Sequence, residues 1–504
     1  NQTKHLKTFL LMRKSKLPFN FYKKPLMWSI FFLLISIGIS AQNKHTNIVS
    51  SVATQNRVSA NRKELNKQAH ESEKIIEPKR KAKSKLTDNK EIEREKEAEE
   101  EEEREKEQKR EGALQRLQRD QLMMKDPKLG YIPNERLLVA KQYKDQLMAL
   151  SMGPLNGVTW KEQGPNNQGG RCRAMVVDPN DGSGNTVWAG SVGGGLWKTT
   201  NINASTPTWV PITDLFANLA ITSIAFDPGN AQIMYFTTGE GYGNSDAIRG
   251  LGVWKSTDGG NTWAQLAATN TSTFHFCQKV IVSNTGVILV ATASGGLQRS
   301  INGGTSFSKV LGTGLGISGA GNNFCYDVDM AANGDIYSTL DGSVHKSTNA
   351  GATFGAAQSL PITAGRIELA CAPNDANYVY ALIENGSTVA GILQTTDAGT
   401  TWLTRTEPDD ADPGIPNADF SRGQAWYDLA IAVDPNNKDR LFVGAIDIFV
   451  SGDGANTWSQ VTHWYGGFGF QNVHADQHNI LFQNGSSSIA YFSNDGGIYR
   501  CTDA

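Results

Sequence analysis

Short runs of apolar residues alternate with turn-forming residues from about residue 155 to the last residue of the chain. Several runs end in Asp-Pro, as at Asp178-Pro179, and a second apolar run follows after a few polar residues. The first runs are Ala174–Val177, Ile221–Phe226, Val280–Val282, Ile367–Cys371 and Leu429–Val433, and their partners are 187–190, 233–238, 287–292, 378–382 and 441–444. Such runs, bounded by Gly, Pro, Asn and Asp, are typical of β-strands. We therefore predict paired strands and an all-β fold for this region.

A polar motif follows these strand pairs at a long, regular period. Its clearest copy is Ser-Thr-Asp-Gly-Gly-Asn-Thr-Trp at 256–263, and its final aromatic recurs at 307, 354, 402 and 458. A degenerate copy begins at Thr199 with its aromatic displaced to Trp209, and another begins at Cys501, which makes seven units. Repeats of about this length are typical of four-stranded propeller blades. The repeat predicts a seven-bladed β-propeller over 154–504, with the last blade incomplete.

The N-terminal third has a different composition. Five basic residues between Arg13 and Lys24, the apolar run Trp28–Ile39 and Ser40-Ala41 follow the order of a secretory signal, which we assign to 1–41. Residues 61–110 hold 32 of the 98 charged residues, 16 of each sign, so 42–125 is interpreted as a charged tether, helical or disordered. Apolar residues at helical spacing predict an amphipathic helix within 126–153 that docks on the following region. Because residue 1 is Asn and the chain stops inside a repeat, we expect a fragment of a longer protein.

The repeated motif resembles the Asp-box, or BNR, repeat of sialidases, sortilin-type propellers and xyloglucan-cleaving tandem propellers. The stretches 160–171 and 194–199 are similar to the opening of exported bacterial BNR-repeat proteins. Many of these end in a type IX secretion sorting domain. The resemblance implies a secreted or cell-surface location, and it is compatible with both enzymes and binding proteins. Where xyloglucan-cleaving relatives carry a catalytic Asp in the first blade, this chain has Ser191.

The charge and cysteine content of the chain exclude some classes of partner and metal site. Lys and Arg number 48 and Asp and Glu number 50, so the net charge of −2 gives no reason to expect nucleic acid, or a membrane except during export. The five cysteines are too few and too scattered for a disulfide framework. They include no Cys-x-x-Cys pair, which excludes a finger-type zinc site.

Candidate catalytic residues are the carboxylates Asp476, Asp495 and Glu240, because glycoside hydrolysis needs one protonated acid and one ionised partner. Candidate binding residues are those with an aromatic face, a guanidinium or an imidazole near these carboxylates: Arg171, Trp426, Tyr427, Trp464, Tyr465, His474 and His478. Ring closure is expected to bring Arg171 beside Asp476 or Asp495. The alternative interpretation of 474–495 is that these side chains tie the last blade to the first.

Three further hypotheses concern ions and acids. If 474–478 were one strand, His474, Asp476 and His478 would share a face and converge on zinc. Arg171, Arg366 and Arg422 would grip a carboxylate if the protein were sialidase-like. The acidic insert with Asp409, Asp410, Asp412 and Asp419 would hold calcium, although no cofactor is required. The sequence favours a propeller that binds an extracellular polysaccharide or protein ligand, with a glycoside hydrolase as the alternative.

Overall fold

The computed structural model describes residues 122–123, 125–133, 136–150, 169–213, 216, 218–244, 247–313, 323–415 and 419–504. The predicted signal region and nearly all of the predicted tether lie outside these residues. Helix α3 (Arg136–Leu150) lies within the predicted helical segment, and its Tyr143 and Leu147 side chains are exposed to solvent. Its docking on the following region stays a prediction.

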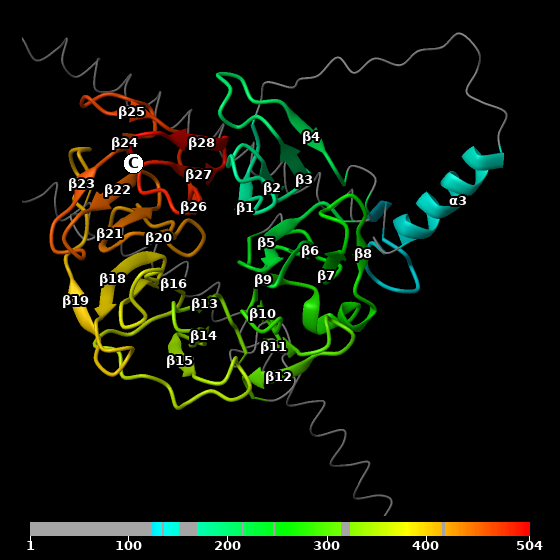
Figure 1. Ribbon diagram of the computed structural model, residues 1–504, viewed down its shortest axis with the longest axis horizontal. Coiled ribbons are helices and arrows are strands. Elements are labelled where there is room, and N and C mark those ends of the chain that lie inside the picture. Colours follow the sequence, from blue (N-terminus) through cyan, green and yellow to red (C-terminus); the bar gives the residue numbers. More distant parts are fainter. Residues whose placement is uncertain are drawn as a thin grey trace, which may run out of the picture. The chain divides into compact units, whose positions relative to one another are not determined.

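The rest of the described chain forms seven antiparallel sheets arranged in a ring, as Figure 1 shows. The strands of blades 1 to 3 are β1 (Cys172–Val177), β2 (Val187–Ser191), β3 (Gly195–Thr199), β4 (Trp209–Pro211), β5 (Ile221–Asp227), β6 (Asn230–Thr238), β7 (Val253–Ser256), β8 (Ala264–Gln265), β9 (Cys277–Val282), β10 (Ile288–Thr292), β11 (Gly296–Ser300) and β12 (Ser308–Leu311). Blades 4 and 5 contain β13 (Val328–Met330), β14 (Ile336–Leu340), β15 (Ser343–Ser347), β16 (Ile367–Cys371), β17 (Val379–Asn385), β18 (Thr388–Thr395) and β19 (Leu403–Arg405). Blades 6 and 7 contain β20 (Ala430–Asp434), β21 (Asn437–Gly444), β22 (Ile448–Ser451), β23 (Ser459–Gln460), β26 (Gln477–Phe482), β27 (Ala490–Asn494) and β28 (Gly497–Cys501).

Few other elements interrupt this pattern within the described residues. The 3₁₀ turns η2 (Ala267–Thr269) and η3 (Ser272–Phe274) precede β9, and the short parallel pair β24 (Thr462–His463) and β25 (Gln471–Asn472) connects blades 6 and 7. Each predicted apolar run coincides with a first or second strand of a blade. The seven-bladed all-β prediction is confirmed.

The repeated polar motif forms a tight turn between the third and fourth strands of a blade. In the copy at 256–263, the Ser256 hydroxyl donates to Asp258 Oδ1 (2.7 Å), and Asp258 accepts from the Thr262 amide (2.9 Å) and hydroxyl (2.6 Å). Gly260 has φ of +84°, a conformation that glycine adopts without strain. Trp263 then packs edge-on against Trp188 of blade 1, with ring centroids 6.4 Å apart. These turns (256–263, 300–307, 347–354, 395–402 and 451–458) are called the repeat turns below.

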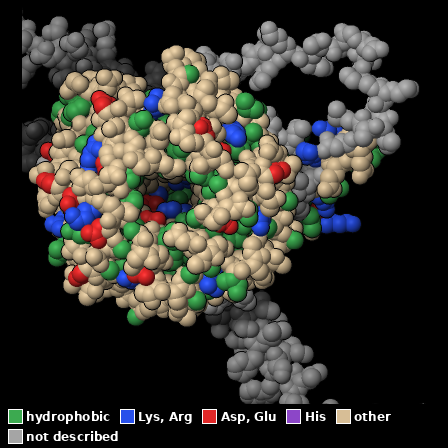
Figure 2. Space-filling model, in the orientation of Figure 1, with side chains coloured by type: hydrophobic (Ala, Val, Ile, Leu, Met, Phe, Trp, Pro, Cys, Tyr) green, Lys and Arg blue, Asp and Glu red, His purple; other side chains and the backbone are tan. Residues whose placement is uncertain are grey.

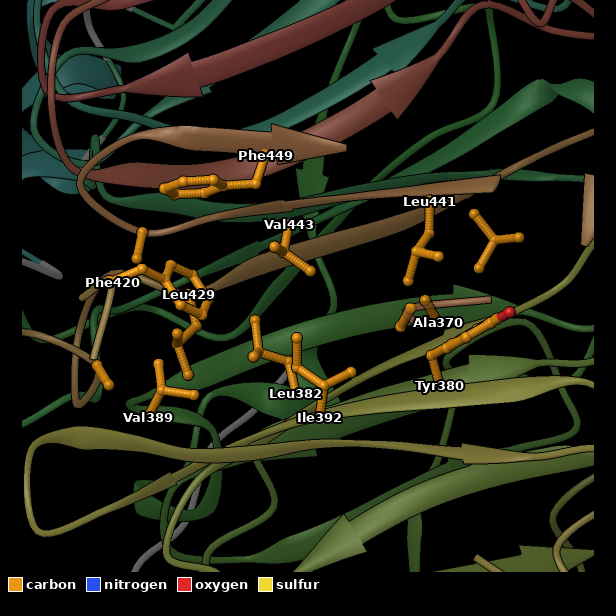
Figure 3. Close-up of a cluster of buried hydrophobic side chains, with 14 of the residues drawn as sticks. Ala370, Tyr380, Leu382, Val389, Ile392, Phe420, Leu429, Leu441, Val443 and Phe449 are labelled. Atoms are coloured by element: carbon orange, nitrogen blue, oxygen red, sulfur yellow. The ribbon is translucent and has the colours of Figure 1, made fainter. Parts of the chain in front are cut away.

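Apolar side chains between neighbouring sheets hold the blades together. Figure 3 shows the cluster between blades 5 and 6, where Leu382 and Ile392 face Val443 and Phe449. Burial of such side chains contributes about 1.5–3 kcal/mol each, so this packing is a main source of stability. The ring closes in the same way, because Tyr491 of blade 7 packs with apolar residues of blade 1. Blade 7 contains three strands within the described residues.

Candidate functional site

The two ends of the propeller carry different loops. Consecutive strands of a blade are antiparallel, so the turns after the first and third strands lie at one end. The repeat turns follow the third strands and therefore lie at this end. The turns after the second strand, and the connections between blades, lie at the other end, here called the loop end. Arg171 precedes β1, Glu240 follows β6, Tyr427 precedes β20 and Asp495 follows β27, so all four lie at the loop end.

Arg171 joins blade 1 to blades 6 and 7. Its Nε lies 2.9 Å from Asp495 Oδ1, and its Nη1 donates to the Tyr427 hydroxyl at 2.8 Å. The same Nη1 lies 3.7 Å from Oε1 of the fully buried Glu240. The side chain of Arg171 is 29% exposed and that of Asp495 is 25% exposed, so both remain accessible to a ligand. The contact between Arg171 and Asp495 that ring closure predicts is present.

Glu240 is held from two sides. The Tyr427 hydroxyl donates to its Oε1, and the Asn244 amide donates to its Oε2 at 2.8 Å. Burial, and then the neighbouring Glu240 carboxylate, raise the pKa of Tyr427, although Arg173 opposes this shift. Because Glu240 is buried and fully bonded, its role in this geometry is to position Tyr427 and Arg171.

His478 connects Asp495 to a second arginine. His478 Nε2 lies 2.7 Å from Asp495 Oδ1, and Arg173 Nη2 lies 3.3 Å from His478 Nδ1. An arginine can only donate, so Nδ1 is the acceptor and Nε2 carries the proton that bonds Asp495. Burial and the Arg173 charge lower the pKa of His478 to about 3. Burial opposes ionisation of Asp495, but the hydrogen bonds from His478 and Arg171 lower its pKa, so Asp495 is an ionised carboxylate. These six residues (Arg171, Arg173, Glu240, Tyr427, His478 and Asp495) are called the loop-end network.

Two further carboxyl groups adjoin the loop-end network. Burial, and then the neighbouring Asp495, raise the pKa of Asp476. Burial, and then Asp476, raise the pKa of Asp428 to about 8. Asp428 Oδ1 lies 3.5 Å from His478 Nδ1. The site therefore places two carboxyl groups with a raised pKa beside an ionised one.

The interpretation of 474–478 as one extended strand is wrong. Strand β26 begins only at Gln477, and Asp476 has φ of +68°, which interrupts the two-residue alternation of side chains. His478 is buried against Asp495, whereas His474 is exposed and bonds the carbonyl of Ala475. The two histidines therefore do not converge on one ion. A positive φ at a non-glycine residue is strained, and such strain is often found at functional sites.

The candidate aromatic residues occupy two places. Trp426 is partly exposed and lies next to Tyr427, with ring centroids 5.2 Å apart. Trp464 and Tyr465 are exposed in the connection between blades 6 and 7, where the Tyr465 hydroxyl donates to Asp412 at 2.6 Å. Tyr427 is buried, so it serves the network rather than a surface platform.

A cavity of about 720 Å³ runs along the innermost strands of all seven blades. Figure 2 shows it as a hollow with acidic and basic side chains inside. Tyr242 lies in its wall between two cations, with Arg173 4.1 Å and Arg366 4.6 Å from its ring. Lys279 Nζ bonds Asp327 Oδ1 at 2.6 Å across blades 3 and 4. Polar and apolar side chains both line the cavity, and two of its cations, Lys279 and Arg366, are paired with carboxylates.

The three arginines of the sialidase-like hypothesis are each held by a different carboxylate. Arg171 pairs with Asp495, Arg366 with Glu368 at 2.8 Å, and Arg422 with Asp410 and Asp412. They do not form one anion-binding cluster. The Ser191 hydroxyl donates to the carbonyl of Arg171 (3.0 Å) and supports the backbone of the site.

Sequence reasoning missed several members of the site. Arg173, Asp428 and Tyr242 lie at the loop end, where each is brought in by a different blade. Arg173 lies only two residues after Arg171, but β1 begins at Cys172 and its register shifts between Cys172 and Ala174, so alternation alone could not place its side chain. Of the acidic insert, Asp409 is exposed and Asp419 bonds Ser421 and Gly423, whereas Asp410 and Asp412 lie together.

The fold and this site define the class of the protein: it is a seven-bladed β-propeller with a polar site at the loop end of a central cavity. Solved structures with a similar fold include the GH74 xyloglucanase from Xanthomonas campestris, with a TM-score of 0.50, 19% identity, and alignment of 67% of this chain to 52% of that chain. An ancestral GH74 enzyme has a TM-score of 0.51 and 19% identity, over 68% of this chain and 46% of that one. YCF48 bound to D1 peptide has a TM-score of 0.46 and 15% identity, over 70% of this chain and 100% of that one.

These likenesses concern the fold. The chain spans about half the length of the GH74 enzymes. No protein-family profile matches the sequence, and no curated protein does. Within the described residues, no helix has both the length and the apolar character needed to cross a bilayer.

Proposed function

We propose that this protein is exported and that its propeller binds an extracellular polysaccharide at the loop end. The basic, apolar and small-residue order of 13–41 supports export, and the repeat resembles that of exported Asp-box proteins. The observation that carries the binding proposal is the loop-end network. It draws residues from four blades and leaves Arg171 and Asp495 partly exposed.

A polysaccharide suits this surface better than a protein ligand. Arg171 and Asp495 offer a donor and an acceptor for sugar hydroxyls, and both are held rigid by buried partners. The exposed ring of Trp426 offers a flat apolar face next to Tyr427. The exposed rings of Trp464 and Tyr465 offer two more at the loop end, in the connection between blades 6 and 7. A protein ligand is the alternative occupant of the same surface.

One observation favours glycoside hydrolysis as a second candidate function. The pKa of Asp476 is raised and that of Asp495 is lowered, which is the division that an acid and an ionised partner require. In that mechanism Asp476 would protonate the leaving oxygen, and Asp495 would act as base or nucleophile. The GH74 neighbours include a xyloglucanase, and xyloglucan is therefore the first substrate to test.

The test is a panel of β-glucans, xyloglucan and sialosides, assayed with the purified protein for binding and for release of reducing ends. We expect at least one β-glucan or xyloglucan to bind, and we expect Asp476→Asn and Trp426→Ala to weaken that binding at least about tenfold, or 1.4 kcal/mol. The melting temperature of both variants should stay near that of the wild type. Asp503→Asn, at the repeat-turn end, is the matched control and should bind normally.

Two outcomes would change the conclusion. Reducing-end release by the wild type that disappears in Asp476→Asn would establish the hydrolase and replace the binding proposal. If Asp476→Asn instead lowers stability by several kcal/mol, as expected for a broken buried polar network, the site is architectural and the binding proposal fails.

A further inference from the structure

A second group of buried polar residues lies at the loop end beside blade 6. Asp410 and Asp412 belong to the connection between blades 5 and 6, Asp447 to the turn between β21 and β22, and His463 to β24. These four residues are called the Asp–His cluster. The loop-end network does not include any of them, so the cluster requires its own explanation.

Three residues of the cluster offer ligand atoms that lie close together. One atom each from Asp410, Asp412 and His463 lie within 4.8 Å of one another. His463 Nε2 is 3.5 Å from Asp412 Oδ2. Arg422 holds the carboxylates in place, with its guanidinium 2.9 Å from Asp410, 2.8 Å from Asp412 and 3.6 Å from Asp447.

His463 is the independent sign that the cluster binds something. Its side chain is 0% exposed, and neither ring nitrogen has a hydrogen-bond partner. A buried polar group without a partner costs about 1–3 kcal/mol, so proteins rarely retain one without a use for it. The His463 ring packs edge-on against Tyr465, with ring centroids 4.1 Å apart, and lies against Phe468, with centroids 5.2 Å apart. Its Nε2 faces the carboxylates.

The net charge of the cluster also favours a bound cation. With all three carboxyl groups ionised, the single guanidinium of Arg422 leaves an excess of two negative charges in a buried site. A divalent cation would balance these two charges.

We propose that Asp410, Asp412 and His463 bind one divalent transition-metal ion of the zinc type. Zinc accepts imidazole nitrogen together with carboxylate oxygen in four-coordinate sites. Calcium takes six to eight oxygen ligands and no imidazole, so the cluster does not suit it. Arg422 is the outer partner that fixes the carboxylates, as such partners do in metal sites.

The ion would tie two loops together. It would link the connection between blades 5 and 6 to the start of the connection between blades 6 and 7. The latter connection carries Trp464 and Tyr465, and Tyr465 already bonds Asp412. The inference concerns structure at the loop end, and it does not depend on which ligand the propeller binds.

The test measures metal content of the full chain rather than its activity. Protein stripped with a chelator is titrated with Zn²⁺ in competition with a chromophoric chelator, and the bound metal is counted after gel filtration. We expect one tightly bound equivalent, and a melting temperature raised by at least about 2 °C. His463→Gln and Asp412→Asn should each lose that equivalent, whereas His345→Gln, which changes a half-buried histidine on blade 4, should keep it.

A cobalt spectrum keeps the test decisive if a variant folds poorly. Co²⁺ bound to the wild-type chain should give the visible absorption of a nitrogen- and oxygen-ligated, four-coordinate ion, and Zn²⁺ should displace it. The proposal is overturned if His463→Gln retains the full equivalent, if wild-type protein binds no stoichiometric Zn²⁺, or if only Ca²⁺ raises the melting temperature. Loss of glycan binding in the proposed-function assay would leave this result unaffected.

Discussion

The carboxylates of the repeat turns and those of the loop end find their partners in different ways. In three repeat turns the carboxylate bonds only its own turn: Asp258, Asp397 and Asp453 all accept from a hydroxyl two residues earlier and from an amide and hydroxyl four residues later. These hydrogen bonds, chiefly those from the threonines, lower the pKa of each carboxyl to about 2. The partners of these three carboxylates are therefore local.

At the loop end, the polar groups bond across blades. Arg171 of blade 1 bonds Asp495 of blade 7, and Tyr427, which precedes blade 6, bonds Glu240 of blade 2. Burial and like charge raise the pKa of Asp428 and Asp447. The repeat turns therefore build the blades, whereas the ionisation of the loop-end carboxyl groups depends on partners far away in the sequence.

The largest expected effect comes from breaking an inter-blade link. Asp327 bonds Lys279 of blade 3 and also accepts from the Leu369 amide of blade 5 at 2.8 Å. Asp327→Ala removes the carboxylate that pairs with Lys279 and leaves the buried Leu369 amide without its acceptor, so we expect the free energy of unfolding to fall by about 3 kcal/mol. Urea unfolding followed by circular dichroism measures this change.

The matched control for Asp327→Ala is Asp453→Ala at the repeat-turn end, where the lost bonds are exposed and local. Its stability loss should be clearly smaller. Equal losses in the two variants would contradict the view that the two ends differ in their dependence on distant partners.

The next effect concerns pH. The pKa of Asp428 is raised to about 8, whereas an unfolded aspartate titrates near 3.9. Between these values the folded state keeps a proton that the unfolded state has released, so this group lowers stability as pH rises and has no further effect above about pH 8. We expect Asp428→Asn to gain stability relative to the wild type from pH 5 to 8.5, by up to about 1.4 kcal/mol per pH unit.

Thermal unfolding of both proteins at pH 5, 6.5 and 8.5 measures this trend. Asp453→Asn serves as the control, because a carboxyl with a pKa of about 2 does not titrate in this range. A difference between Asp428→Asn and the wild type that stays constant with pH would show that Asp428 is already ionised in the folded protein.

The blades could be predicted from sequence because their determinants are local. The turn at 256–263 needs only a hydroxyl, a carboxylate and glycine within eight residues, and the strands need only short apolar runs. The contact of Arg171 with Asp495 could also be predicted, since ring closure brings the first and last blades together.

The rest of the site could not be predicted, because its determinants are not local. The pKa of Asp428 depends on burial and on Asp476, far along the chain in another blade. The positive φ of Asp476 comes from its place in the entry to β26, so alternation alone gave a false zinc site there. The grouping of His463 with carboxylates could not be predicted for a similar reason, since Asp410 and Asp412 come from a different loop.

The smallest expected effect comes from replacing the repeat-turn carboxylates with amides. Asn302 already occupies this position in one repeat turn, where its Oδ1 accepts from the Ser300 hydroxyl (2.9 Å) and the Ser306 amide (3.0 Å). The triple variant Asp258→Asn, Asp397→Asn, Asp453→Asn should therefore melt within a few degrees of the wild type at pH 7. Below pH 4 the two proteins should differ in slope. Carboxyls with a folded pKa of about 2 stabilise the protein above pH 4, and they lose this contribution as pH falls toward 2. The amide variant lacks that loss, so its melting temperature should fall less steeply between pH 4 and 2. Parallel melting curves over this range would mean that the repeat turns do not hold their carboxylates ionised.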